Sequence, residues 1–116
     1  MNSVCVEVVN AQVGATPYLI RHGENGLVYP GNSYEKMEET VLHLFQNWDA
    51  YKKMGRAAYE TIRDIWNADH AAQELLRFTN GLIQGEIIPA RSGPLSIAPA
   101  IGPRRMYRAM MESQKS

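Results

Sequence analysis

The pattern of hydrophobic and polar positions predicts two short strands joined by a turn and a short helix. Four valines within residues 4–9 recur at strand spacing, so residues 4–12 are predicted to form a strand. Residues 27–29, Leu-Val-Tyr, form an apolar run between two turn-forming dipeptides. Such a run predicts a second strand, buried in an α/β sheet. Between the two runs, Gly14 and Pro17 indicate a tight turn followed by a short helix.

Two glycines are predicted to hold the turns before the second strand. Gly23 is expected just past the short helix, in the left-handed backbone conformation that residues with a side chain resist. Asn25-Gly26 is a strong turn signal. Gly26 is therefore also expected at positive φ, leading directly into the strand.

Helical spacing predicts three longer helices, at residues 33–47, 49–66 and 68–83. Asn32 opens the first with a capping-box-like pattern, and Asn67 can cap the third. The apolar stripes of these helices are expected to meet in one core. Its predicted members are Leu44, Phe45, Ile62, Leu75 and Leu76.

The helical period ends at Gly85. Four prolines follow between residues 89 and 103, together with further glycines, so residues 85–103 are predicted to be a linker or an extended arm. One or two helical turns could follow near Met110. The predicted organisation is a globular unit at residues 1–84 and a Pro/Gly-rich basic tail at residues 85–116.

Composition narrows the class of protein. With 45% hydrophobic and 21% charged residues among 116, the chain has the composition of one ordinary globular domain. No stretch approaches the roughly 18 apolar residues of a membrane span. The amino terminus lacks the features of a secretory signal, and a single cysteine, Cys5, excludes an internal disulfide. The expected location is the cytoplasm.

Charge is unevenly distributed although its formal sum is zero. Residues 1–85 carry 7 Lys and Arg against 10 Asp and Glu, and residues 86–116 carry 5 against 2. Arg104, Arg105 and Arg108 make the tail basic, so it could contact the anionic inner face of a membrane. A solvated, weakly ordered end is the simpler interpretation. No nucleic-acid partner is expected.

Residues 13–30, VGATPYLIRHGENGLVYP, resemble the family 4 (group 1) glycosyltransferases. The C-terminal, nucleotide-sugar-binding domain of that family carries V-G-G/A-x-P-x-x-I and then D/H-G-x-N-G-L-L/V-x-P. The resemblance continues with a helix opened at Gly31-Asn32, a K-M-G-x-A-A-Y/R helix at residues 53–59, and a tryptophan-led last helix from Trp66. It extends roughly over residues 8–84. It implies an α/β fold, a partial Rossmann-like (GT-B C-terminal) domain with two short strands and three longer helices.

The resemblance also implies where a donor would bind. In the family, the diphosphate lies at a helix amino terminus, and two glutamates eight positions apart contact the sugar and the ribose. Here Asn2-Ser3-Val4-Cys5 runs almost directly into Glu7, so that helix is missing. Glu7 is the candidate donor-binding residue, as a displaced counterpart of the second glutamate. The alternative interpretation is that Glu7 is a solvent-facing residue on an edge strand.

The function implied is that of a C-terminal glycosyltransferase fragment. Such an enzyme transfers a sugar from a nucleotide-sugar donor to a glycan or lipid-linked acceptor, as in polysaccharide biosynthesis. Transfer also needs the amino-terminal acceptor domain, so the truncated domain at residues 1–84 is expected to be inactive alone, and no catalytic residue is assigned. No cofactor is expected, and His22, His43 and His70 lack metal-ligand spacing. The alternative is a non-catalytic protein-interaction module derived from the same fold, because an incomplete sheet would leave apolar surface uncovered.

Overall fold

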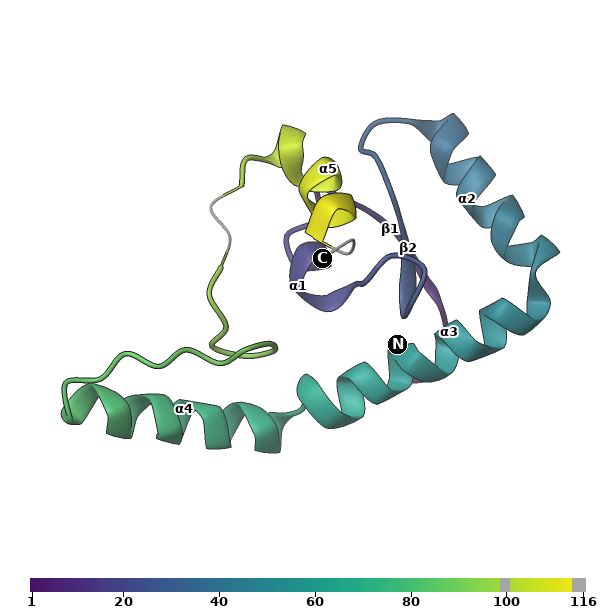
Figure 1. Cartoon of the computed structure of the whole chain (residues 1–116). Helices are drawn as coiled ribbons and strands as arrows, with labels where there is room; N and C mark the ends of the chain where they lie inside the picture. Colours follow the sequence, from purple (N-terminus) through teal and green to yellow (C-terminus); the bar gives the residue numbers. More distant parts are fainter. Residues whose placement is uncertain (99–100, 114–116) are drawn as a thin grey trace.

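A two-stranded parallel sheet lies at the centre of the fold. The computed structural model describes residues 1–98 and 101–113. Strand β1 (Glu7–Asn10) pairs with β2 (Gly26–Tyr29), and the helix α1 (Thr16–Leu19) lies between them in sequence. In Figure 1 the sheet lies between α1 and α5 on one side and α2 and α3 on the other. This mixed α/β arrangement, with two parallel strands and several helices, is compatible with part of a Rossmann-like domain.

The remaining elements are helical. In chain order they are α2 (Tyr34–Gln46), α3 (Trp48–Glu60), a π-helical turn η1 (Thr61–Ile65), α4 (Ala68–Ile83) and α5 (Pro103–Ser113). The Asn67 side chain accepts a hydrogen bond from the His70 N–H at 2.8 Å, which confirms the predicted cap of α4. The cap of α2 is Ser33, whose hydroxyl accepts from the Lys36 N–H at 3.2 Å, one residue after the predicted Asn32. None of the described helices is long and apolar enough to cross a membrane.

The turn before β2 differs from the prediction in one respect. Gly23 has φ +81°, as expected, but Gly26 is not among the positive-φ residues, so that prediction is wrong. Gly26 is already part of β2, where it pairs with Glu7. A Cβ on Gly26 would lie 2.9 Å from Ile20 Cγ2 and 3.2 Å from the Glu7 carbonyl oxygen. Close packing between the strand and Ile20, rather than backbone conformation, is therefore what requires glycine there.

The core is smaller than predicted and lies elsewhere. Its main cluster consists of Ala11, Ile20, Val28 and Met110. The predicted core members Phe45, Leu75 and Leu76 are 69%, 54% and 65% exposed, and that part of the prediction is wrong. Leu44 and Ile62 are half-buried. A sheet of two four-residue strands offers too little surface to cover both α2 and α4.

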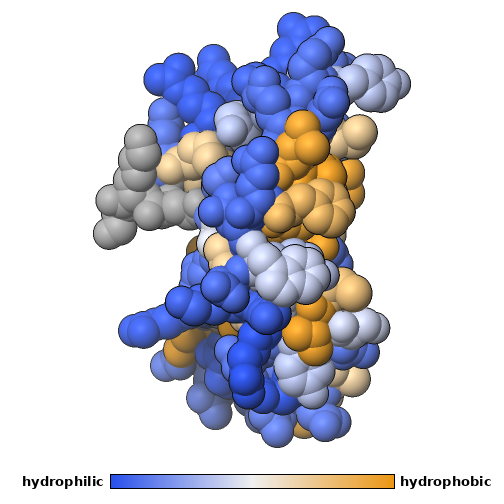
Figure 2. All heavy atoms as spheres, turned by 90° about the vertical axis from the view of Figure 1, so that its right-hand side faces the viewer, coloured by the Kyte–Doolittle hydropathy of each residue, from blue (hydrophilic) through white to orange (hydrophobic). Residues whose placement is uncertain are grey.

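The molecule is correspondingly open. Its accessible surface is 8226 Å², against roughly 6400 Å² for a compact monomer of this mass. Its radius of gyration is 16.0 Å, against about 13 Å for a compact domain of this length. Figure 2 shows apolar side chains gathered at the surface of the face that α2 presents. The exposed large apolar residues of α2 and the start of α3 are Tyr34, Met37, Leu42, Phe45 and Trp48.

The tail is partly irregular and partly helical. Residues 86–98 follow no helix or strand, as predicted, but α5 extends over eleven residues instead of one or two turns. Met110 of α5 is buried in the main core cluster. The tail therefore contributes to the same core as the two strands. Residues 99–100 and 114–116 of the predicted tail lie outside the described residues, and the division at residue 84 stays a prediction.

Candidate functional site

A cavity of about 390 Å³ lies at the carboxyl ends of the two strands. In open α/β sheets, ligands bind outside these ends of the strands. Its lining residues are Asn10, Tyr29, Asn32, Ser33, Tyr34 and Met37. None of these is a Lys or Arg. The lining of this cavity, called the carboxyl-edge cavity below, thus offers amide, hydroxyl and aromatic groups, and Arg104 and Arg105 line a neighbouring cavity that shares Asn32 with it.

Internal hydrogen bonds hold the polar groups of this cavity. Asn10 Oδ1 accepts from the Gln12 N–H at 2.8 Å. The Ser33 hydroxyl caps α2 and donates to Glu35 Oε2 at 3.0 Å. The N–H of Glu35 and then this hydroxyl lower the pKa of the Glu35 carboxyl. That carboxylate stays ionised at the start of α2, where it opposes an incoming phosphate and leaves the cavity better suited to neutral hydroxyl groups.

Glu7, the predicted donor-binding residue, lies at the opposite edge of the sheet. It begins β1, beside Gly26, whereas the carboxyl-edge cavity adjoins Asn10 at the other end of the strand. Glu7 Oε1 accepts a hydrogen bond from the Met1 amino group at 3.1 Å. The structure therefore does not bring Glu7 together with that cavity. Its role in donor binding stays a prediction.

His22 caps the hydrogen-bonding edge of β2. Its Nδ1 accepts from the Val28 N–H at 3.0 Å, so the ring occupies a place where a third strand would otherwise accept. Burial lowers the pKa of His22 below its ordinary 6.5, and the neighbouring His43 acts in the same direction. Because Nδ1 accepts this hydrogen bond, the neutral ring carries its proton on Nε2, and the lowered pKa favours that neutral form. The sequence indicated His22 only as a residue near a helix end.

Folding stability is expected to fall as the pH drops below about 6.5, the pKa of an unfolded histidine. Because the pKa of His22 is lowered in the folded state, the unfolded chain binds the proton first as the pH falls. The stability that the neutral ring contributes is lost as the pH falls from the pKa of the unfolded chain through the pKa of the folded chain. His22→Asn supplies an amide oxygen that does not titrate, so it should flatten this part of the profile. Urea unfolding from pH 7.5 to 5.5 measures the effect, with His70→Asn as control. An identical slope in wild type and His22→Asn would contradict the assignment.

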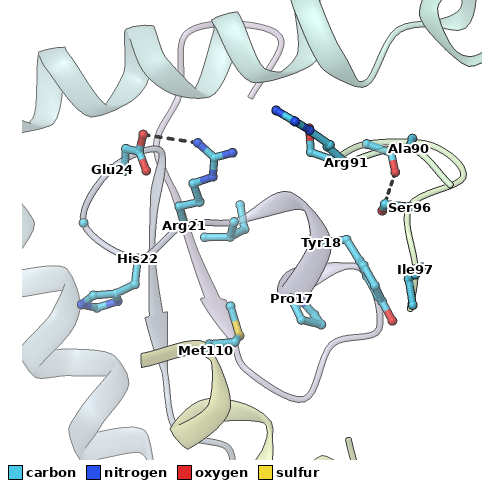
Figure 3. A pocket seen from close by; sticks show the side chains of 14 residues that line it. Pro17, Tyr18, Arg21, His22, Glu24, Ala90, Arg91, Ser96, Ile97 and Met110 are labelled. Atoms are coloured by element: carbon cyan, nitrogen blue, oxygen red, sulfur yellow. Dashed lines mark hydrogen bonds and ion pairs between the residues drawn. The ribbon is translucent and has the colours of Figure 1, made fainter. Parts of the chain in front are cut away.

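A larger cavity, about 890 Å³, lies on the side of the amino-terminal strand ends, and is called the amino-edge cavity below. It opens between the segment that follows α1 and residues 90–97 (Figure 3). Arg21 and Arg91 both line it. Neither residue carries a signal in the sequence, because seventy positions separate them and no motif joins them. Within the described part of the chain, no three His, Cys, Asp or Glu side chains are grouped as a metal site requires.

The chain is similar to a mannosyltransferase from mycobacteria. Two curated proteins of Mycobacterium tuberculosis, from strains CDC 1551 / Oshkosh and ATCC 25618 / H37Rv, are each described as a GDP-mannose-dependent alpha-(1-6)-phosphatidylinositol monomannoside mannosyltransferase. Each is 30% identical over 76 residues, which are 66% of this chain. The chain spans only 20% of the length of these relatives. No family model and no solved structure matches it.

Proposed function

We propose that this chain is a C-terminal part of a glycosyltransferase that takes its sugar from a nucleotide-sugar donor, of the family 4, GT-B type. The observation that carries the proposal is the 30% identity over 76 residues with a GDP-mannose-dependent mannosyltransferase. The parallel pairing of β1 and β2 supports it, since such pairs are the unit of nucleotide-binding α/β domains. GDP-mannose is the donor to test first. The acceptor would be a glycan or a lipid-linked glycan.

The chain alone is expected to lack transferase activity. Among the described residues, those that line its carboxyl-edge cavity include no Lys or Arg for a diphosphate, and Glu35 stays negative beside it. The excess of exposed surface supports a larger assembly, because the apolar faces of α2 and α4 lack cover. In this proposal an amino-terminal acceptor domain and further strands supply both the cover and the phosphate contacts. Glu7 would contact the donor only in that assembly.

A chimera tests the proposal. The 76 aligned residues of the mycobacterial enzyme are replaced by those of this chain, and GDP binding is measured by thermal shift alongside mannose transfer. We expect GDP to stabilise the chimera with an affinity within about tenfold of the parent's, a difference of at most about 1.4 kcal/mol in binding free energy. The isolated chain should bind GDP-mannose no tighter than roughly millimolar, about 4 kcal/mol of binding free energy.

Two further variants sharpen the result. Glu7→Gln in a chimera whose graft includes residue 7, with Glu38→Gln as a matched exposed control, tests whether Glu7 contacts the donor. A smaller graft that carries only residues 13–32 tests the motif if the longer graft does not fold. A folded chimera that gains no stability from GDP contradicts the proposed function.

The exposed apolar faces also favour a second candidate function, a protein-interaction module. Phe45, Trp48 and Leu76 are each more than half exposed, which is unusual for large apolar side chains grouped on helices. Light scattering at increasing concentration separates the candidates: association supports the module, and a monomer at high concentration counts against it.

We also propose a membrane contact for helix α5. Its side chains Arg104, Arg105 and Arg108 are exposed, and this basic face would lie against the inner, cytoplasmic face of a membrane.

A further inference from the structure

The amino-edge cavity brings two guanidinium groups and one carboxylate together. In Figure 3, Arg91 extends toward Arg21, and Glu24 lies on the other side of Arg21. Arg21 Nη1 is 3.5 Å from Glu24 Oε1, and both side chains are more than half exposed. An ion pair this long and this exposed holds Arg21 only weakly. Arg21 can therefore turn toward another anion at little cost.

Arg91 has no partner of its own in residues 1–98 and 101–113. It makes neither a hydrogen bond nor an ion pair there, and the same holds for the adjacent Ser92. Of the described residues that line the cavity, Glu24 is the only one with a carboxylate, which leaves the two arginines with an excess of one positive charge. Positive charge without a matching carboxylate favours an anionic ligand.

The loop that carries Arg91 is held in place by its own contacts. The Ala90 N–H donates to the Leu95 carbonyl at 3.2 Å, and the Ser96 hydroxyl donates to the Gly93 carbonyl at 2.7 Å. Gly93 has φ +79° and is packed so closely against Ile65 that a Cβ would lie 2.7 Å from its Cγ2. The loop is thus closed on itself and anchored on η1. This arrangement holds the backbone of Arg91 in one position, so less conformational entropy is lost when a ligand binds.

We propose that the amino-edge cavity binds a phosphorylated small molecule, with its phosphate between Arg21 and Arg91 and an apolar group against Tyr18 and Ile97. A guanidinium presents a planar fork of donors that matches phosphate oxygens. Tyr18 and Ile97 lie next to one another in Figure 3, away from the two arginines, and both are exposed enough to be reached. The cavity has room for such a ligand, since small-molecule sites commonly occupy about 300–1,000 Å³.

This site is distinct from the proposed donor site. It lies on the side of the amino-terminal strand ends, away from the carboxyl-edge cavity, and Glu7, the candidate donor contact, is not among its lining residues. The inference therefore stands or fails independently of the proposed glycosyltransferase function. The chemistry of the proposed ligand, a phosphomonoester on an apolar group, occurs both in soluble metabolites and in phospholipids.

Nuclear magnetic resonance of the isotope-labelled full chain tests the inference. Phenyl phosphate is titrated in, and we expect saturable shifts of the Arg91 and Ser92 amide signals. Arg91→Gln and Arg21→Gln should each weaken binding by about tenfold or more, because each removes a charge-assisted contact. Arg56→Gln, an exposed arginine outside the cavity, should leave the affinity unchanged. Glu24→Gln should strengthen binding several-fold, because it removes the competing carboxylate.

Several outcomes would overturn the inference. These are the absence of saturable shifts, equal binding of phenol, and an equal loss of affinity in Arg56→Gln and Arg91→Gln, which would indicate diffuse charge attraction only. Dihexanoyl phosphatidic acid, a water-soluble lipid with the same phosphomonoester, identifies the source. If it binds more tightly than phenyl phosphate, the natural ligand is a lipid headgroup, and if it binds more weakly, a soluble metabolite.

Discussion

Replacing Asn25 with alanine is expected to lower the free energy of unfolding by about 2–4 kcal/mol, from the combined loss of several buried hydrogen bonds. The Asn25 side chain is only 3% exposed although it is polar. Its Oδ1 accepts from the Arg21 N–H at 2.7 Å, and its Nδ2 donates to the Leu19 carbonyl and to Thr61 Oγ1. One amide thus joins the end of α1, the following turn and η1. Alanine would leave the backbone groups of Arg21 and Leu19 without these partners.

Variants of Asn25 and Thr61 separate the contributions. Asn25→Asp keeps the acceptor for Arg21 but loses both donors, so it should be almost as unstable as the alanine variant near neutral pH. Thr61→Val removes the bond of 2.9 Å between Asn25 and Thr61, and also the bond of 2.8 Å that the Thr61 hydroxyl donates to the Ala57 carbonyl. A double-mutant cycle in urea, followed by circular dichroism, should give a coupling of about 0.5–1.5 kcal/mol for this pair. A loss below half a kilocalorie in Asn25→Ala would place the side chain in solvent.

Local signals in the sequence predicted most of the secondary structure. The strand at residues 27–29, the three longer helices and the cap at Asn67 depend on neighbours within about four positions, and the structure confirms them within a few residues. The strand predicted at residues 4–12 was too long, because only Glu7–Asn10 has a partner in β2. The length of a strand depends on how many of its residues pair with a neighbouring strand, and the sequence of one strand does not show this.

Burial could not be predicted in the same way. Helical periodicity correctly showed that Phe45 and Leu76 lie on apolar faces, but it cannot show whether anything covers those faces. The described part of the chain has only two strands, and both residues are exposed. Conversely, Met110 follows a Pro/Gly-rich stretch with no clear period, yet it is buried against Ile20 and Val28. Whether these three side chains are buried depends on contacts between distant segments of the chain.

The candidate sites show the same limit. The resemblance to glycosyltransferases pointed to Glu7, whereas the amino-edge cavity is lined by Arg21 and Arg91, which no motif links. Asn25 was predicted as a turn residue, a role that does not imply hydrogen bonds to Thr61, thirty-six positions away. In each case the missing information is which segment packs against which.

Gly26 is expected to accommodate a side chain only at a cost, and Gly26→Val should destabilise the fold by about 1–3 kcal/mol, the range typical of overpacked core positions. A Cβ at this position meets Ile20 on one side and the Glu7 carbonyl on the other, at 2.9 and 3.2 Å. The Glu7 carbonyl belongs to the paired strand, so it cannot move without breaking the sheet. The resulting strain differs in kind from that at Gly23, which has open space around it but φ +81°.

Asparagine distinguishes the two glycines because it accepts positive φ more readily than other residues but still carries a Cβ. Gly23→Asn should therefore cost less than about 1 kcal/mol, since it keeps the left-handed conformation without a clash. Gly26→Asn should cost nearly as much as Gly26→Val, since its Cβ meets the same atoms. Thermal and urea unfolding of the two asparagine variants provide the measurement. The reverse order, with Gly26→Asn mild and Gly23→Asn severe, would mean that the left-handed residue of the turn is Gly26 and that β2 begins after it.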